Sequence, residues 1–168
     1  SAGVSGEIVS RGRITMPGYL NRAEASQESE YIDTNGQQWL RSGDIGQLDD
    51  EGFLYIVDRK KDMILSGGQN IYPQDIEAVV ALHEMVYDVA VIGAPSERWG
   101  ETPIALVVPT PGVTVCDDCR AAIRGFANER LGKQQRIADV VVVDELPRNP
   151  NGKILKRELR EQFKHLQY

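Results

Sequence analysis

The chain has 168 residues, of which 41% are hydrophobic and 26% charged, a composition typical of a globular domain. Nineteen lysine and arginine residues against twenty-five acids give a formal charge of −6, which argues against non-specific binding to nucleic acid, because such binding needs a basic face. No apolar run approaches the about 20 residues that span a bilayer, and the first residues lack a secretory signal pattern, so we expect a cytoplasmic protein without a membrane span.

The first third of the chain is rich in glycine and turn residues, and its strand candidates are short. Turn chemistry at residues 33–36 and 49–52 separates them, and only residues 22–29 have a helical pattern. The strand candidates are Glu7–Ser10, Trp39–Arg41, Ile45–Leu48 and Phe53–Val57. Because this part has few bulky apolar residues, we expect residues 1–57 to be the β-rich edge of a larger body.

After Pro73 the pattern changes. Residues 74–84 and 117–131 carry apolar stripes of helical period, and a last helix carries its stripe at Leu155, Leu159, Phe163 and Leu166. Three β-branched runs predict buried strands at Val86–Ile92, Ile104–Val108 and Val140–Val143. We therefore expect an α+β fold, in which residues 62–168 form a compact domain with a small three-stranded sheet and flanking helices.

Four consecutive charged residues, 58–61, separate these two parts. A surface turn does not require this density of charge. A hinge between two bodies must stay solvated while its backbone torsions change, so we expect a hinge at residues 58–61.

The two cysteines form a C-x-x-C pair, Cys116 and Cys119. Without an export signal, the default is a pair of free thiols in a reducing cytoplasm, with no special role. A redox pair or half of a zinc site are the alternatives. A zinc site would need two more ligands, and the only histidines, His83 and His165, lack a paired spacing.

Several motifs in order and in register resemble one family. They are "GEIVSRG" (6–12), "GYLNRAEAS" (18–26), "LRSGDIGQLDDEGFLYIVDRKKDMILSGGQNIYPQDIE" (40–77), "SERWGE" (96–101) and "LPRNPNGKILKRELR" (146–160). Together they resemble the C-terminal part of the adenylate-forming (AMP-forming) superfamily, which includes acyl-CoA synthetases, peptide-synthetase adenylation domains and luciferases. The segment "DRKKDMILSGGQNIYP" most resembles the acyl-CoA synthetases.

The resemblance implies a two-step ligase. A carboxylate, here of a fatty or related acid, attacks the α-phosphate of ATP to give an acyl-adenylate and pyrophosphate. A C-terminal lid domain then rotates, and the thiol of coenzyme A takes the acyl group. In this family the glycine-rich phosphate loop, the acyl pocket and the Mg²⁺-binding acid belong to a large N-terminal domain. We therefore expect this chain to be inactive alone, and we predict no metal ligand in it.

The resemblance also assigns roles to residues. Asp44 matches the aspartate that accepts hydrogen bonds from the ATP ribose hydroxyls, and Arg59 matches an arginine near the ribose and phosphates. Lys61 matches the hinge position. Gly67 and Gly68 match a loop that approaches the pantetheine arm of coenzyme A in the second step.

Lys153 matches the adenylation lysine, which bridges the substrate carboxylate and the α-phosphate. Acylation of this lysine would remove its charge, so a lysine acyltransferase is an expected partner. Relatives carry an aromatic-Lys-x-Pro segment where this chain has residues 134–137, "QQRI". Arg136 could still contact a phosphate of coenzyme A, but the aromatic residue and the proline are missing.

That departure leaves alternatives open. The acyl group could pass to a carrier-protein thiol or to an amine in place of coenzyme A. A non-catalytic interaction module derived from the lid is a third interpretation, which the retention of Asp44, Arg59 and Lys153 disfavours.

Overall fold

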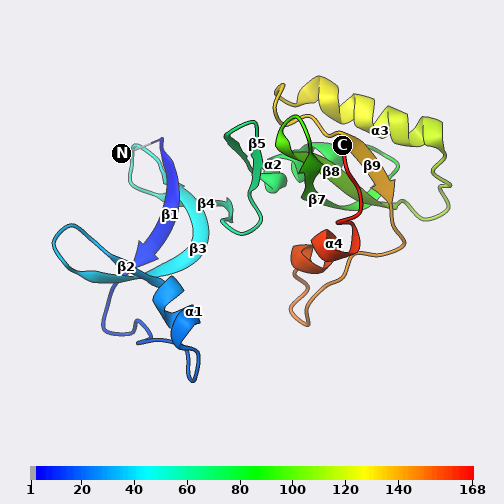
Figure 1. The fold of residues 1–168 in the computed structure, drawn as a ribbon. Helices are drawn as coiled ribbons and strands as arrows, with labels where there is room; N and C mark the ends of the chain where they lie inside the picture. The colour runs from blue at the N-terminus through cyan, green and yellow to red at the C-terminus, as the bar shows by residue number, and fades with distance from the viewer. Residues whose placement is uncertain (1–2) are drawn as a thin grey trace. The chain divides into compact units, whose positions relative to one another are not determined.

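The computed structural model describes residues 3–168, which divide into two compact units, one ending at Lys61 and the other comprising Asp62–Tyr168 (Figure 1). The elements in chain order are β1 (Ser5–Ser10), α1 (Ala23–Glu28), β2 (Glu30–Ile32), β3 (Gln38–Leu48), β4 (Leu54–Arg59), β5 (Ile64–Ser66), β6 (Gln69–Ile71), α2 (Pro73–Val80), β7 (Val86–Ser96), β8 (Gly100–Pro109), α3 (Asp117–Arg130), β9 (Asp139–Val142) and α4 (Lys156–Gln162). The α+β class that we predicted is confirmed.

The first unit is a four-stranded antiparallel sheet built around β3, which pairs with β1, β2 and β4. We predicted two short strands at Trp39–Arg41 and Ile45–Leu48, but the structure has one strand of 11 residues. The prediction was wrong because Ser42 and Gly43 resemble a turn. Pairing overrides that local preference, since the first half of β3 pairs with β2 and the second half with β4.

The first unit has almost no core. Ile45 is its one buried apolar side chain among the described residues, whereas a row of large apolar side chains on β4 and its approach is exposed. Exposed members are Phe53 (62%), Leu54 (51%), Tyr55 (59%) and Ile56 (66%). An apolar surface of this kind usually marks a face that another part of a protein covers.

The second unit contains a five-stranded sheet in the order β6-β5-β8-β7, with β9 parallel to β8. The three strands predicted here are present as β7, β8 and β9. The predicted strand number was too small, because β5 and β6 have only three residues each, too few to show an alternating pattern.

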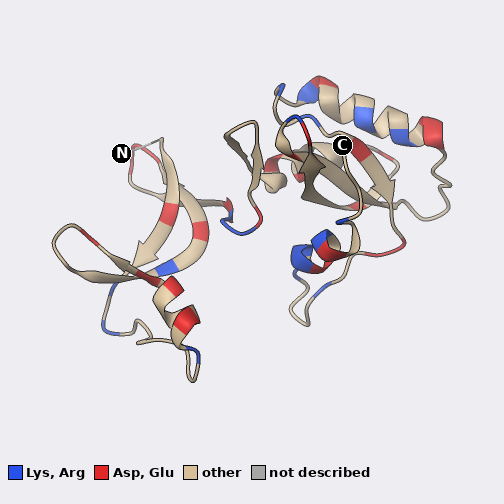
Figure 2. Cartoon of the chain, viewed as in Figure 1, with Lys and Arg blue, Asp and Glu red and all other residues tan. Residues whose placement is uncertain are grey.

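Alternation along β7 and β8 divides the core of the second unit into two layers. Val89, Val91, Ala105 and Val107 pack with residues of α2 and α3, and Ala90, Ile92, Ile104 and Leu106 pack with Leu159 of α4. Helices therefore cover both faces of the sheet, and most of β7 and β8 is free of charge while α3 and α4 carry many charged residues (Figures 1 and 2).

Helix α2 is shorter than the predicted helix over 74–84. It starts at Pro73, a favoured first position, and ends at Val80. Leu82 and His83 then donate to carbonyls three residues earlier, which tightens the chain into a turn. Within residues 3–168, no helix combines the length and apolarity needed to cross a bilayer.

Candidate nucleotide site and the loops of Gly67 and Lys153

Asp44 and Arg59 form an ion pair across two neighbouring strands. The register of β3 and β4 places the two residues opposite each other, and Arg59 Nε lies 2.8 Å from Asp44 Oδ1. We predicted that the strand before the charge cluster would end at Val57, but β4 continues through Arg59, because Asp58 and Arg59 still pair with β3. The Arg59 side chain is 59% exposed and its terminal amino groups form no ion pair with another described residue, so they are available to an anion.

A cavity of about 630 Å³ lies in the first unit beside this pair. Its lining includes five cationic side chains and only two acidic ones. The cations are Arg22, Arg41, Arg59, Lys60 and Lys61, and the acids are Glu7 and Glu28. Such an excess of positive charge in a hollow favours an anionic ligand.

Glu7 organises the cations of this cavity. Its Oε2 accepts from Arg41 Nη1 and from Lys60 Nζ, each at 2.8 Å. Burial alone would raise the pKa of Glu7, but the hydrogen bonds and charges of Lys60 and Arg41 outweigh burial and hold the pKa below its usual value. Sequence reasoning missed Glu7 and Arg41, because 34 residues separate them and only the pairing of β1 with β3 brings them together.

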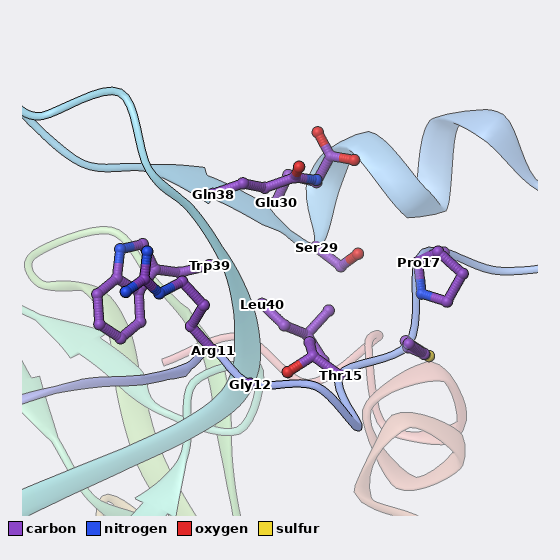
Figure 3. A pocket seen from close by; sticks show the side chains of 11 residues that line it. Arg11, Gly12, Thr15, Pro17, Ser29, Glu30, Gln38, Trp39 and Leu40 are labelled. Carbon is purple, nitrogen blue, oxygen red and sulfur yellow. The ribbon is translucent and has the colours of Figure 1, made fainter.

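A second hollow of about 200 Å³ contains none of the predicted site residues. It lies between the loop after β1 and strands β2 and β3. The Arg11 guanidinium lies over the Trp39 ring, 5.1 Å from its centre (Figure 3). We assign this hollow no role.

Gly67 and Gly68 form the two-residue turn between β5 and β6. Their φ angles are +56° and +79°, and positive φ at both central residues is the requirement of a type I′ hairpin turn. Gly67 also donates its N–H to the Trp99 carbonyl at 2.8 Å, and a Cβ on Gly67 would lie 2.9 Å from the Trp99 ring. The backbone of this turn is therefore exposed and unobstructed at Gly68, but is packed against Trp99 at Gly67.

We expect Gly67→Ala to destabilise the second unit more than Gly68→Ala. Both changes place a side chain at positive φ, which costs about 1 kcal/mol, and only the change at Gly67 also displaces the Trp99 ring. Urea unfolding followed by Trp99 fluorescence in a Trp39→Phe background measures the difference. Equal losses of stability in the two variants would contradict the packing role of Gly67.

Lys153 lies on a loop that the side chain of Asn149 organises. Asn149 Oδ1 accepts from the N–H groups of Asn151 and Lys153 at 3.0 and 2.9 Å, and the Asn149 N–H donates to the Lys153 carbonyl at 2.9 Å. The Lys153 side chain is exposed, and its ammonium group forms no ion pair with a described residue. The loop thus holds the backbone of Lys153 while its charge remains available.

Two ion pairs fix this loop to the body of the second unit. On the N-terminal side of Lys153, Arg148 Nη2 lies 2.5 Å from Oδ2 of Asp88, a residue of β7. After Lys153, Lys156 Nζ lies 2.8 Å from Glu77 Oε1 on α2, with the two side chains only 11% and 19% exposed. Sequence reasoning missed both anchors, because their partners are 60 and 79 residues apart in the chain.

Arg136 is exposed in the connection between α3 and β9. The next residue is fixed, because the Ile137 N–H and carbonyl both bond the Asn128 side chain, at 2.8 and 3.0 Å.

Of the predicted site residues, the structure brings Asp44 together with Arg59 and places Gly67 and Gly68 in one turn. Lys61, Arg136 and Lys153 are each exposed, and Lys61 lines the larger cavity. Within residues 3–168, no three His, Cys, Asp or Glu side chains gather into a group that could hold a metal ion.

Comparison with known proteins relates this chain to one family. Residues 75–153 match the AMP-binding enzyme C-terminal domain. A 3-[(3aS,4S,7aS)-7a-methyl-1,5-dioxo-octahydro-1H-inden-4-yl]propanoyl:CoA ligase of Rhodococcus jostii is 46% identical over 162 residues, which are 96% of this chain and 30% of the ligase. A 2-succinylbenzoate–CoA ligase of Bacillus thuringiensis is 44% identical over 156 residues, which are 93% of this chain and 30% of that ligase.

Solved structures agree with this match. ATP-bound MatB from Rhodopseudomonas palustris superimposes with a TM-score of 0.85 at 32% identity, over 98% of this chain and 31% of MatB. The amide bond synthetase McbA from Marinactinospora thermotolerans gives a TM-score of 0.77 at 31% identity, over 97% of this chain and 32% of McbA. The chain therefore spans about a third of the length of the proteins that it matches.

Proposed function

We propose that this chain is the C-terminal part of an adenylate-forming enzyme and works within a full-length AMP-forming carboxylate–CoA ligase. The match of residues 75–153 to the AMP-binding enzyme C-terminal domain and the similarity to the C-terminal part of CoA ligases support this proposal. That enzyme activates a carboxylic acid with ATP and passes the acyl group to coenzyme A. The observation that carries this proposal is the Asp44–Arg59 pair beside a cavity lined by five cationic side chains.

In this proposal, the first unit contributes half of the ATP site. Asp44 accepts hydrogen bonds from the two ribose hydroxyls, for which its carboxylate has enough lone pairs even while Oδ1 accepts from Arg59. The free amino groups of Arg59 and the neighbouring cations attract the phosphates. Mg²⁺, the acyl pocket and the remaining phosphate contacts belong to the large N-terminal domain.

Lys153 is the proposed adenylation lysine. Its exposed ammonium group bridges the substrate carboxylate and the α-phosphate, and offsets the negative charge that develops as the acyl-adenylate forms. A lysine acyltransferase that modifies Lys153 would remove this charge and switch off adenylation. We further propose that the enzyme acts in the cytoplasm.

The division of the chain supports a moving lid. We propose residues 1–57 as the edge of the large domain, 58–61 as the hinge and 62–168 as the lid. Within the hinge, Asp58 and Arg59 still pair with β3, so Lys61, the last residue of the first unit, is the proposed pivot. The exposed side chains Phe53, Leu54 and Ile56 would then pack against the large domain. Lid rotation replaces Lys153 by Gly67 and Gly68 at the reaction centre. Beyond its two chain neighbours, a Cβ placed on Gly68 would meet no atom of residues 3–168 within 4 Å, so the space beside this glycine is open to the pantetheine arm.

The acceptor has two alternatives to coenzyme A. Residues 134–137 lack the aromatic residue and the proline, and the amide bond synthetase McbA is among the similar structures. An amine or a carrier-protein thiol could therefore replace coenzyme A. If coenzyme A is the acceptor, Arg136 is the residue that we expect to contact its phosphate.

ATP–pyrophosphate exchange by the full-length protein tests the proposed function. A panel of aliphatic, aromatic and dicarboxylic acids should reveal one class that switches exchange on, and addition of coenzyme A or an amine to the same reaction then identifies the acceptor. Absence of exchange with every acid, from folded protein that binds ATP, would instead favour the non-catalytic module.

We expect Asp44→Ala in the full-length enzyme to raise the KM for ATP by about 10- to 100-fold, because hydrogen bonds to a charged group contribute about 1.5–3 kcal/mol. Asp50→Ala is the matched control, since Asp50 is an exposed acid in the turn after β3. An unchanged KM in Asp44→Ala would remove Asp44 from the ATP site.

A further inference from the structure

The two cysteines lie together at the start of α3. Cys116 is the N-cap residue of this helix, and its Sγ accepts from the Cys119 N–H at 3.4 Å. The two Sγ atoms are 2.7 Å apart, in direct hydrogen-bond contact. Positions three residues apart face the same side of a helix, so the contact follows from the C-x-x-C spacing. Cys116 is exposed and Cys119 partly exposed, so a small reagent can reach the pair.

The surroundings make the two thiols unequal. A hydrogen bond from Cys119, together with backbone N–H groups at the helix start, lowers the pKa of Cys116. The same hydrogen bond raises the pKa of Cys119, because Cys119 must keep its proton to donate it. Asp117 and Asp118 are the charged neighbours in the first turn, and Arg120 Nη1 lies 3.3 Å from Asp117 Oδ1. Cys116 is thus suited to attack a disulfide as a thiolate. Cys119 is suited to displace the mixed disulfide that this attack would leave on Cys116.

We propose that Cys116 and Cys119 form a reversible dithiol–disulfide site that reacts with low-molecular-weight disulfides such as glutathione disulfide. The Cys116 thiolate attacks one sulfur of glutathione disulfide, forms a mixed disulfide and releases one glutathione thiolate. Cys119 loses its proton to solvent and attacks Sγ of Cys116, which forms the Cys116–Cys119 bond and releases the second glutathione thiolate. Both thiolates take up protons, so the protein loses two electrons and glutathione disulfide gains them.

The location favours this reaction over a zinc site and over a purely structural role for the pair. A zinc site needs further ligands, and no third His, Cys, Asp or Glu joins the pair among residues 3–168. A purely structural role would place the sulfurs in the core, but α3 buries Ile123 and Ala127 and leaves its cysteine end at the surface. The disulfide therefore closes without disturbing the packed face of α3. This inference is independent of the ligase activity.

Peptide mapping of the full-length protein tests the site, because trypsin releases both cysteines in one peptide, residues 99–120. After equilibration in buffers of increasing oxidised-to-reduced glutathione ratio and acid quenching, we expect this peptide to become lighter by two hydrogens. Cys119→Ser should stop at the mixed disulfide with glutathione. Cys116→Ser should react about tenfold more slowly, because the remaining Cys119 lies inside α3 and not at the N-cap, where backbone N–H groups stabilise a thiolate.

Two results would overturn the proposal. The first is a wild-type peptide that remains a dithiol, alkylated at both sulfurs, in oxidised glutathione alone. The second is equal reaction rates for Cys116→Ser and Cys119→Ser, which would remove Cys116 as the attacking thiol.

Discussion

Replacement of Lys153 by alanine in the full-length enzyme is expected to lower the rate of ATP–pyrophosphate exchange by about 10²–10³-fold. Loss of one well-placed donor to a developing negative charge costs about 2.7–4 kcal/mol of transition-state stabilisation. The ammonium group of Lys153 has the required freedom, because no described residue pairs with it, while Asn149 holds its backbone. The KM for ATP should change much less than kcat, because the contact strengthens only as the adenylate forms.

The second half-reaction provides the sharpest control for this result. When a synthetic acyl-adenylate and coenzyme A are supplied, Lys153→Ala should form the thioester at nearly the native rate, because the proposed rotation removes Lys153 from the reaction centre. Lys133→Ala, which removes an exposed lysine of the α3–β9 connection, should leave both steps unchanged. If Lys153→Ala slowed both half-reactions equally, the lysine would hold the loop or the fold, and its assignment to adenylation would be wrong.

Sequence patterns predicted the second unit better than the first, for a physical reason. Apolar runs such as Ile104–Val108 bury both faces of a central strand, so composition alone identifies them. In the first unit nearly every strand lies at the surface, and pairing partners decide where each strand ends. The extension of β3 through Ser42 and Gly43 is of this kind, because it depends on β2 and β4 together.

The residues of the candidate site also fall into those that the sequence predicted and those that only the structure revealed. Asp44, Arg59 and Lys153 stand in motifs, so resemblance was sufficient to select them. Glu7 and Glu77 also fall in quoted motifs and Asp88 does not, but none of the three shares a motif with its partner, because each partner lies 34 to 79 residues away. The pairings that position these residues are therefore visible only in the fold, whereas the residues that we propose to touch a ligand were selected from the sequence.

Removal of the Glu77 carboxylate should be costly for the second unit, and we expect Glu77→Ala to lower its free energy of unfolding by about 2–3 kcal/mol. Glu77 Oε1 accepts from Lys156 Nζ at 2.8 Å and from the Val91 N–H at 2.7 Å. Alanine leaves a nearly buried ammonium group and a backbone donor of β7 without this acceptor, and both losses carry a desolvation cost. Urea unfolding of the 168-residue chain, followed at Trp99 in a Trp39→Phe background, measures the change.

Two further variants separate the ion pair from general damage. Glu161→Ala breaks the Glu161–Lys164 pair, whose side chains are 73% and 68% exposed, and should cost no more than about 0.5 kcal/mol. Lys156→Met in the Glu77→Ala background removes the unpaired charge but keeps the apolar stem, so it should recover about 1 kcal/mol of the free energy of unfolding.

Because Lys156 begins α4 three residues after Lys153, Glu77→Ala should also slow adenylation in the full-length enzyme, and the double variant should restore part of that rate. A cost for Glu77→Ala no greater than that of Glu161→Ala would show that this pair neither stabilises the unit nor anchors the lysine loop.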